Sequence, residues 1–334
     1  MKFPVETIRK IAVFRALQLG DMLCAVPAFR ALRAAYPNAE IVLLGLPWAK
    51  AFTERFSAYF DRFLHFPGYP GLPEQPFDRP AWQQFVGRMS DEKFDLILQM
   101  QGNGSIVNEM LCGMDAGIVA GFHSEGNEGN PEYFVRYPTG ISEIHRHLRL
   151  MEHLGIPTLG DHLEFPIREE EARNLYVNNP ALMRERYVCV HPGSRGAWRQ
   201  WPPSHFACLA DQCAGRGYQV VVTGTAGEAP ITREVIELMD YPAIDLTGRT
   251  DLGEIGQLIR EADLLISNCT GVSHIAAAVR TPSIVISMDG EPERWGPLNK
   301  ELHKTIDWTR DANFDSVLSQ MESLLEDQYQ AAQS

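Results

Sequence analysis

Several features that would point directly to a function are missing from this sequence of 334 residues. Its six cysteines form no CxxC pair, no Cys/His cluster has metal-ligand spacing, and no apolar stretch is long enough to cross a membrane. The GxGxxG, Walker A and GxSxG motifs are also absent, so the chemistries that they indicate lose support. We therefore expect no metal site, no bound cofactor and a reduced, cytoplasmic location.

Basic residues are fewer than acidic ones. The chain has 30 Lys and Arg against 43 Asp and Glu, a formal net charge of −13, and it contains no basic run. Proteins that follow a nucleic-acid backbone need a basic surface, so nucleic acid is not expected as the main partner. A local basic pocket for a small phosphate ligand is compatible with this balance. Arg15 and Asp21 end the first apolar run early, which argues against a secretory leader.

Short apolar runs rich in β-branched residues alternate with longer helical patterns. This alternation predicts an α/β fold with parallel sheets covered by helices, in two doubly wound domains, 1–165 and 166–334. The boundary falls in a segment, 164–182, that prolines and asparagines punctuate, and a last amphipathic helix over 313–330 can pack back on the N-terminal domain. A helix is expected over 22–35. The strands expected from continuous apolar runs are 11–14, 40–44, 94–98, 187–190, 219–223, 263–267 and 283–286.

The strongest local signal is a strand, a small polar turn and a helix start over residues 267–278. Free N–H groups and the helix dipole make such a helix N-terminus an anion site. The hydroxyls of Thr270 and Ser273 add donors, and His274 adds a cation when it is protonated. The alternative is a capped helix whose histidine is only packed. Cys269 acting as a nucleophile, with His274 as its base, is a weaker hypothesis.

A second signal is the loop that follows the strand 187–190. Gly193 allows close backbone approach, and Ser194, Arg195 and Arg199 can contact phosphate oxygens. The alternative is a surface loop that its two tryptophans anchor.

Two acidic residues follow other predicted strands. Asp21, after Gly20 at the first strand-to-helix turn, can cap the helix, act as a general base, or do both. Glu228 can accept hydrogen bonds from ribose hydroxyls or simply cap the next helix.

Taken together, these segments resemble glycosyltransferase family 9, the group that contains the lipopolysaccharide heptosyltransferases, over residues 8–300. Any one motif is modestly specific, and four in the right order are strong. The segments that carry the resemblance are Gln18–Leu23 with Val26–Ala28, Asp95–Asn103 with Ala120–Phe122, His191–Pro202, and Leu246–Gly248 through Gly271–Ala278.

The resemblance implies a GT-B fold, in which two Rossmann-like domains face each other across a cleft, and an inverting transfer without a metal. Asp21 matches the general base, and Arg199 matches a lysine that neutralises the donor diphosphate. On the acceptor side we place Gly20, Gln101 and Asn103. The donor-binding residues implied are Gly193, Ser194, Arg195, Arg199, Glu228, Cys269, Thr270, Gly271 and His274.

The implied reaction moves a sugar, with heptose a candidate and an ADP-linked donor favoured, to a glycan or lipid-linked acceptor of the lipopolysaccharide type. Such an acceptor implies peripheral contact with the inner face of a membrane. Cys269 stands where the family usually has aspartate. This departure keeps two alternatives open: a diverged member that binds nucleotide or nucleotide sugar with little transfer, and a nucleotide-sugar epimerase of the GT-B type. The oligomeric state is open.

Overall fold

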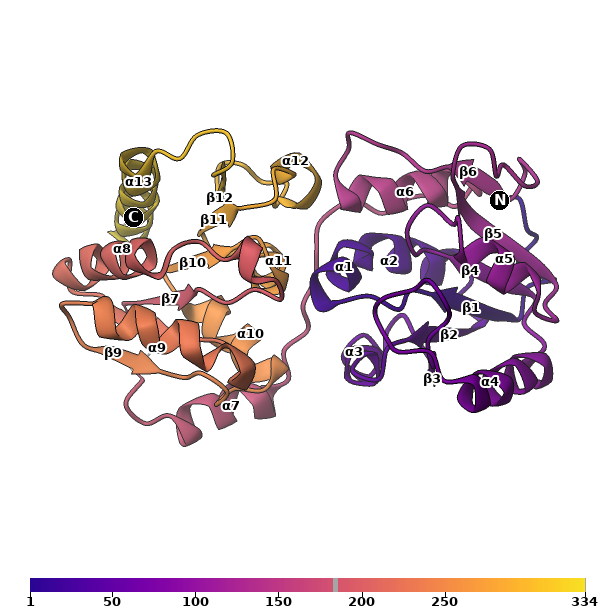
Figure 1. Cartoon of the computed structure of the whole chain (residues 1–334), viewed down its shortest axis with the longest axis horizontal. Coiled ribbons are helices and arrows are strands. Elements are labelled where there is room, and N and C mark those ends of the chain that lie inside the picture. The colour runs from indigo at the N-terminus through magenta and orange to yellow at the C-terminus, as the bar shows by residue number, and fades with distance from the viewer. Residues whose placement is uncertain (183–185, 334) are drawn as a thin grey trace. The chain divides into compact units, whose positions relative to one another are not determined.

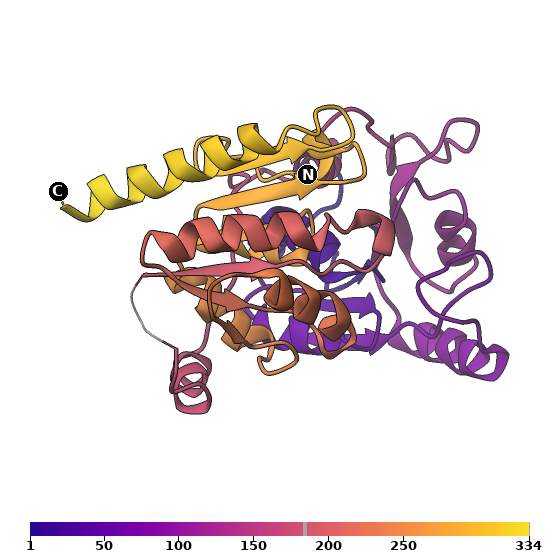
Figure 2. The same ribbon diagram turned by 60° about the vertical axis from the view of Figure 1, so that its left-hand side comes forward.

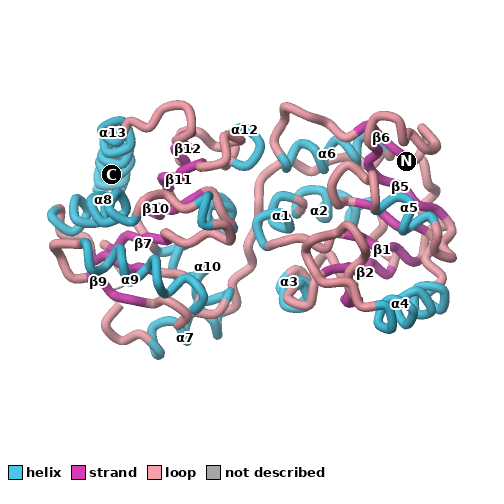
Figure 3. The backbone as a smooth tube through the Cα atoms, viewed as in Figure 1, coloured by secondary structure: helices cyan, strands magenta, loops and turns pink. Residues whose placement is uncertain are grey.

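The computed structural model describes residues 1–182 and 186–333. The chain divides into two compact units, residues 1–162 and 163–334. In the described part of the chain, each unit has one six-stranded sheet, and helices enclose its strands (Figures 1 and 3). The predicted α/β fold with two Rossmann-like parts is therefore confirmed. The segment 164–182, in which the domain boundary was expected, contains the helix α7 (Glu169–Asn178).

The sheet of the first unit has the strand order β3-β2-β1-β4-β5-β6, and its neighbouring strands all run parallel. This is a doubly wound order whose direction reverses between β1 and β4, and ligands bind beyond the carboxyl ends of the strands at such a switch point. Residues Ile11–Phe14 of β1 are wholly buried, because helices cover both faces of a parallel sheet. The strands are β1 (Lys10–Phe14), β2 (Glu40–Gly45), β3 (Arg62–His65), β4 (Leu96–Gln99), β5 (Ile118–His123) and β6 (Phe134–Arg136).

The single helix predicted over 22–35 is two helices, which meet at Ala25. Pro27 lies in the first turn of the second helix. The N–H groups of a first turn have no intrahelical acceptor, so the N–H that proline lacks costs no hydrogen bond there. The sequence prediction was therefore wrong about continuity. The helices of this unit are α1 (Leu19–Cys24), α2 (Val26–Ala35), α3 (Ala49–Arg55), α4 (Arg79–Glu92), α5 (Val107–Cys112) and α6 (Glu143–His153).

The sheet of the second unit repeats this topology. Its order, β12-β11-β10-β7-β8-β9, places the switch point between β7 and β10. The strands are β7 (Tyr187–His191), β8 (Gln219–Val222), β9 (Ala243–Asp245), β10 (Leu264–Asn268), β11 (Ser283–Ser287) and β12 (His303–Asp307). The helices after α7 are η1 (Ala197–Arg199), α8 (Pro203–Gly215), η2 (Ala226–Glu228), α9 (Ala229–Leu238), α10 (Leu252–Glu261), α11 (Gly271–Val279), α12 (Pro292–Trp295) and α13 (Phe314–Gln333).

The last helix, α13, lies beside α8 (Figure 2). Its buried residues Val317, Met321, Leu324 and Leu325 belong to the apolar core that covers one face of the second sheet. No helix among the described residues is both long and apolar enough to cross a membrane.

Candidate functional site

Asp21 lies at the switch point of the first sheet, in the first turn of the helix that follows β1. Its Oδ2 accepts a hydrogen bond from the main-chain N–H of Gln18 at 3.3 Å, so the carboxylate does contribute to capping α1. The side chain is only half-buried. Gly20 precedes it in the same turn. The cap found here is compatible with a second role as a base, because a carboxylate carries two acceptor oxygens.

The other two residues expected on the acceptor side follow β4. Gln101 is buried, and its Oε1 accepts a hydrogen bond from the N–H of Ala16 at 2.7 Å. It therefore ties the loop after β4 to the loop after β1. Asn103 is exposed, with its Oδ1 accepting from the N–H of Ser105 at 3.1 Å. Asn103 is thus the more accessible of the two to a ligand.

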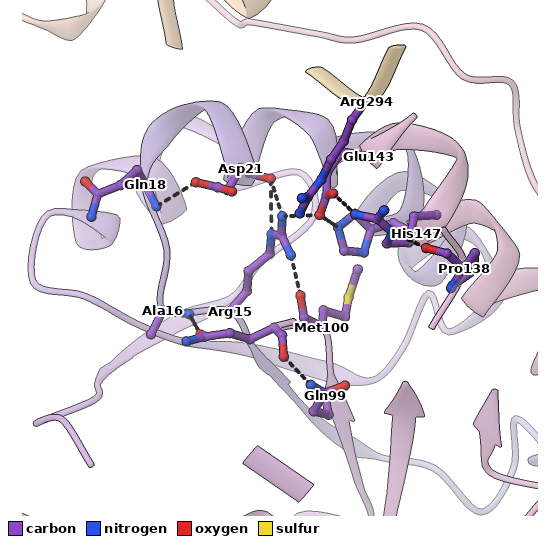
Figure 4. A network of polar contacts seen from close by, with 12 residues as sticks. Arg15, Ala16, Gln18, Asp21, Gln99, Met100, Pro138, Glu143, His147 and Arg294 are labelled. Atoms are coloured by element: carbon purple, nitrogen blue, oxygen red, sulfur yellow. Dashed lines mark hydrogen bonds and ion pairs between the residues drawn. The ribbon is translucent and has the colours of Figure 1, made fainter. Parts of the chain in front are cut away.

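A buried polar network that sequence reasoning missed lies beneath Asp21 (Figure 4). Arg15 directly follows β1, and its side chain has no exposed surface. Its guanidinium donates to the main-chain carbonyls of Asp21 and Met100 and lies 3.5 Å from Oε1 of Glu143. An arginine directly after an apolar strand was the one sequence signal for this network.

Glu143, the first residue of α6, is the acidic centre of the network. It forms an ion pair with Arg146, and Nε2 of His147 lies 3.3 Å from its Oε1. Burial alone raises the pKa of Glu143, but His147, Arg15 and Arg146 outweigh it and hold this pKa well below its ordinary range. Burial, reinforced by the charge of Arg15, lowers the pKa of His147 to about 4. The network therefore contains ionised Glu143 and neutral His147 at neutral pH.

In the second unit, Asn268 fixes the loop that follows β7. It is the last residue of β10 and is fully buried. Its Nδ2 donates to the carbonyl of Pro192 at 2.7 Å, and its Oδ1 accepts from the N–H of Trp201 at 3.0 Å. One side chain thus joins both ends of the loop to the switch point. Sequence reasoning did not single out Asn268.

Gly193, which lies in that loop, is packed against Glu228, the last residue of η2. A Cβ on Gly193 would lie 2.2 Å from Cδ of Glu228, so any larger residue would have to displace this carboxylate. Glu228 accepts from the N–H of Thr225 at 2.7 Å and from its hydroxyl at 2.9 Å, and it lies 4.0 Å from Nε2 of His191. Burial lowers the pKa of His191, and the charge of Glu228 opposes that shift. Glu228 therefore closes the capping box of the short helix η2, but it makes no side-chain capping bond to α9, the helix that it was weighed to cap.

The remaining residues of the loop differ in accessibility. Ser194 is buried, and Arg195 is exposed. Arg199 is 34% exposed and donates to Oδ2 of Asp289 at 2.5 Å. Asp289 follows β11, its side chain is 6% exposed, and its Oδ1 accepts from the hydroxyl of Ser287 at 2.8 Å. Asp289 is thus a carboxylate in this region that sequence reasoning missed.

The start of α11 completes this part of the second unit. Thr270 is its N-cap residue but makes no side-chain capping hydrogen bond, and within the described ranges its buried Oγ1 has no hydrogen-bond partner. Ser273 uses its hydroxyl to donate to the carbonyl of Thr270 at 2.7 Å. Gly271 is the first helical residue, and His274 is buried one turn on. A helix N-terminus with an unused hydroxyl suits an anionic group.

Cys269 directly precedes this helix start. Burial, with the charge of Asp289, raises the pKa of its thiol to about 12. The thiol is therefore protonated at neutral pH, which argues against its use as a nucleophile. Among residues 1–182 and 186–327, no group of three or more His, Cys, Asp or Glu side chains could hold a metal ion.

A polar hollow of about 470 Å³ is lined by residues that begin at Gly290, next to Asp289 in the sequence. Gly290 and the start of α12 form one wall, and β12 with the turn after it forms the other. The charged and hydroxyl residues that line it are Glu291, Glu293, Lys300, Thr305, Asp307 and Arg310.

Comparisons with known proteins agree on one family. The sequence model described as glycosyltransferase family 9 (heptosyltransferase) matches residues 82–318. Lipooligosaccharide heptosyltransferase 2 of Haemophilus influenzae is 24% identical over 306 residues, which cover 84% of each chain. The solved structure of a family 9 glycosyltransferase from Veillonella parvula has a TM-score of 0.79 and 18% identity, with 98% of this chain and 100% of that chain covered. The structure of Escherichia coli ADP-heptose lps heptosyltransferase II has a TM-score of 0.75 and 20% identity, covering 96% and 100% of the two chains.

Proposed function

The chain belongs to glycosyltransferase family 9, and from this premise we propose that it transfers a heptose from an ADP-linked donor to a lipopolysaccharide-type acceptor, with inversion at the anomeric carbon. Glycosyl transfer follows from the family itself. The choice of sugar and nucleotide is supported by the names of its relatives, among them an enzyme described with ADP-heptose. We further propose that the protein works on the cytoplasmic face of the membrane that holds such an acceptor.

The observation that carries the proposal is that Arg199 and the start of α11 both lie at the switch point of the second sheet. Ligands of doubly wound sheets bind at this position. The guanidinium supplies a cation, and the first turn of α11 supplies N–H groups and the unused hydroxyl of Thr270. These groups suit the diphosphate of a nucleotide sugar, and they can stabilise the negative charge that it gains as it leaves. We therefore propose that no metal is needed.

Asp21 is the proposed general base. In the transfer step, the oxygen of an acceptor hydroxyl forms a bond to the anomeric carbon on the face opposite the diphosphate. The bond from that carbon to the diphosphate oxygen breaks, and the diphosphate leaves with the electron pair. Asp21 takes the proton of the hydroxyl as the new bond forms. Gly20 and the exposed Asn103, at the same switch point, are proposed to contact the acceptor.

The experiment that tests the donor half of the proposal is thermal unfolding with ADP, UDP, GDP and CMP, without added metal. A ligand at about 100 times its dissociation constant stabilises the folded state by about 2.7 kcal/mol, which raises the midpoint measurably. We expect ADP to stabilise the protein selectively. Equal effects of all four nucleotides, or none, would contradict the proposed donor site.

Transfer itself is tested with ADP-heptose and a heptose-deficient lipopolysaccharide. We expect ADP to be released only when the acceptor is present, with one heptose added to the product. A second candidate function, binding of nucleotide sugar without transfer, is favoured by Cys269, whose protonated thiol supplies no negative charge. Stabilisation by ADP without any heptosylated product would support that candidate instead. A changed sugar in the absence of acceptor would indicate an epimerase.

A further inference from the structure

The buried guanidinium of Arg15 is bound to the backbone of the residue proposed as the base. Its Nη2 donates to the carbonyl oxygen of Asp21 at 2.8 Å, and its Nε donates to the same oxygen at 3.1 Å. A third donor, Nη1, binds the carbonyl of Met100 directly after β4. A buried cation is tolerated only when its donors are used in this way. Arg15 therefore connects the ends of β1 and β4 to the first turn of α1.

These bonds take the place of an ordinary helical contact. In an α-helix the carbonyl of Asp21 would accept from the N–H of Ala25, four residues on. That N–H instead donates to the carbonyl of Met22 at 3.1 Å. The helix α1 is six residues long and ends at Cys24, so it has little intrinsic stability of its own. The position of its first turn depends on the guanidinium beneath it.

Glu143 in turn orients the guanidinium. Its Oε1 lies 3.5 Å from Nη2 of Arg15, and its side chain is 5% exposed. Arg146 and His147, one turn further along α6, contact the same carboxylate. Figure 4 shows His147 beside it. The acid that holds Arg15 is therefore itself fixed by residues of its own helix, α6.

We propose that Arg15 is a positioning residue for Asp21, and that Glu143 keeps its guanidinium in place. The inference rests on the proposed function, because it assigns Arg15 a role through the base. A base displaced by about 1 Å loses on the order of 100-fold in rate, so a contact that fixes the turn carrying the carboxylate governs turnover. Arg15 itself touches no reacting atom in this proposal.

The test is Arg15→Lys in the full chain. Lysine keeps the positive charge beside Glu143, but a single ammonium cannot supply the forked donors that now bind Asp21 and Met100. We expect kcat for heptose transfer to fall about 10- to 100-fold. The KM for ADP-heptose and the thermal shift caused by ADP should stay at the wild-type values, because the donor residues lie in the other unit.

Arg33→Lys is the matched control. Arg33 also donates to main-chain carbonyls, those of Tyr59 and Ala39, and pairs with Asp61 at 2.5 Å, but it makes none of the contacts to Asp21. We expect it to cost stability without changing kcat. An Arg15→Lys variant with wild-type kcat, or an equal loss of kcat in Arg33→Lys, would overturn the inference.

Two further measurements distinguish a failure of this inference from a failure of the proposed function. Wild-type transfer and its loss in Asp21→Asn test the proposed function first. In the double variant, Arg15→Lys should lower kcat by less than about threefold beyond the loss caused by Asp21→Asn alone. The effects of substituting residues that act as a unit are not additive. Multiplied losses would overturn the positioning role. Should Arg15→Lys show no cooperative unfolding, Glu143→Gln replaces it in the same cycle, because it removes the charge that orients Arg15 without removing the guanidinium group itself.

Discussion

Arg199 donates a hydrogen bond to Asp289 at 2.5 Å across a sequence separation of 90 residues. The two side chains come from the loops after β7 and β11, and Asp289 is the more buried of them. The cation proposed to meet the donor diphosphate is thus already held by a carboxylate. Asp289 thus restricts the rotamer of Arg199 before a ligand binds to its remaining donors. Binding therefore costs less side-chain entropy.

Arg199→Met tests this arrangement. It removes the cation and leaves the carboxylate of Asp289 without its charged partner. We expect the unfolding free energy to fall by about 1–2 kcal/mol, less than for a fully buried pair because Arg199 is 34% exposed. Stabilisation by ADP should be lost. Arg216→Met, which breaks the more exposed pair with Glu322, should cost under about 0.5 kcal/mol and leave the ADP effect unchanged. A normal ADP effect in Arg199→Met would exclude the proposed contact.

Asp21→Asn tests the base. The amide keeps an oxygen that can accept from the N–H of Gln18, so the start of α1 should persist. We expect kcat to fall about 10²- to 10⁴-fold, the usual contribution of a general base, with unchanged stabilisation by ADP. Steady-state assays of ADP release measure the loss. Asp78→Asn is the control, because Asp78 also caps a helix of this unit, accepting from the N–H of Ala81 at 2.7 Å. Near-normal turnover by Asp21→Asn would rule out the role.

Gly193→Ala tests the packing of the loop after β7 against Glu228. The added Cβ would lie 2.2 Å from Cδ of Glu228, so the carboxylate must move. We expect a loss of about 1–3 kcal/mol in chemical denaturation, together with weaker nucleotide binding. Adding Glu228→Ala should restore part of that stability, since the two changes share one contact. Gly227→Ala, whose Cβ would come no nearer than 3.9 Å to Thr225, should be nearly neutral. Additive losses in the double variant would contradict the steric explanation.

His147 makes the stability of the first unit depend on pH. Its pKa is about 4 in the folded chain against 6.5 when unfolded. Between these values the unfolded chain binds more protons, so stability rises with pH and is lost as pH falls from about 6.5 to about 4. The difference of about 2.5 pKa units corresponds to about 3 kcal/mol. His147→Phe should flatten this dependence in urea denaturation at pH 4.5–7.5.

His303 supplies an internal reference for that experiment. Burial, with the charge of His274, lowers its pKa to about 4 as well, and it lies in the second unit. The corresponding acid dependence of the second unit should survive in His147→Phe. If both units keep their full acid dependence in the variant, His147 is not its source.

Most strands that have a neighbour on each side could be predicted because they are buried on both faces. Tyr187–Val190, for example, has no exposed residue and appears in the sequence as a plain apolar run. The exception is β5, which lies between β4 and β6 but was missed. The edge strand Arg62–His65 was missed, because only Leu64 is buried there and the strand begins and ends with a charged or polar residue. Pattern reasoning therefore identifies central strands of a parallel sheet more readily than its edges.

The proposed site residues follow strand ends, where sequence motifs are local and can be recognised. The groups that hold them in place are distant in sequence and were not found. Glu143 lies 128 residues from Arg15, and Asp289 lies 90 from Arg199. An ion pair leaves no pattern in the sequence when its partners come from different elements. Only the folded arrangement of these elements brings the side chains together.

The strand order also determines which strand edges of a newly made chain stay unpaired during translation. The first strand of each unit to be synthesised is central in its sheet: β1 pairs with both β2 and β4, and β7 pairs with both β8 and β10. The apolar run Ile11–Phe14 therefore leaves the ribosome long before Leu96–Gln99 can cover its second edge. Unpaired apolar strands at that stage are the segments to which other chains, or chaperones, attach. One period of aggregation risk during translation thus begins with β1 and ends when β4 has emerged, and a second begins with β7 and ends when β10 has emerged.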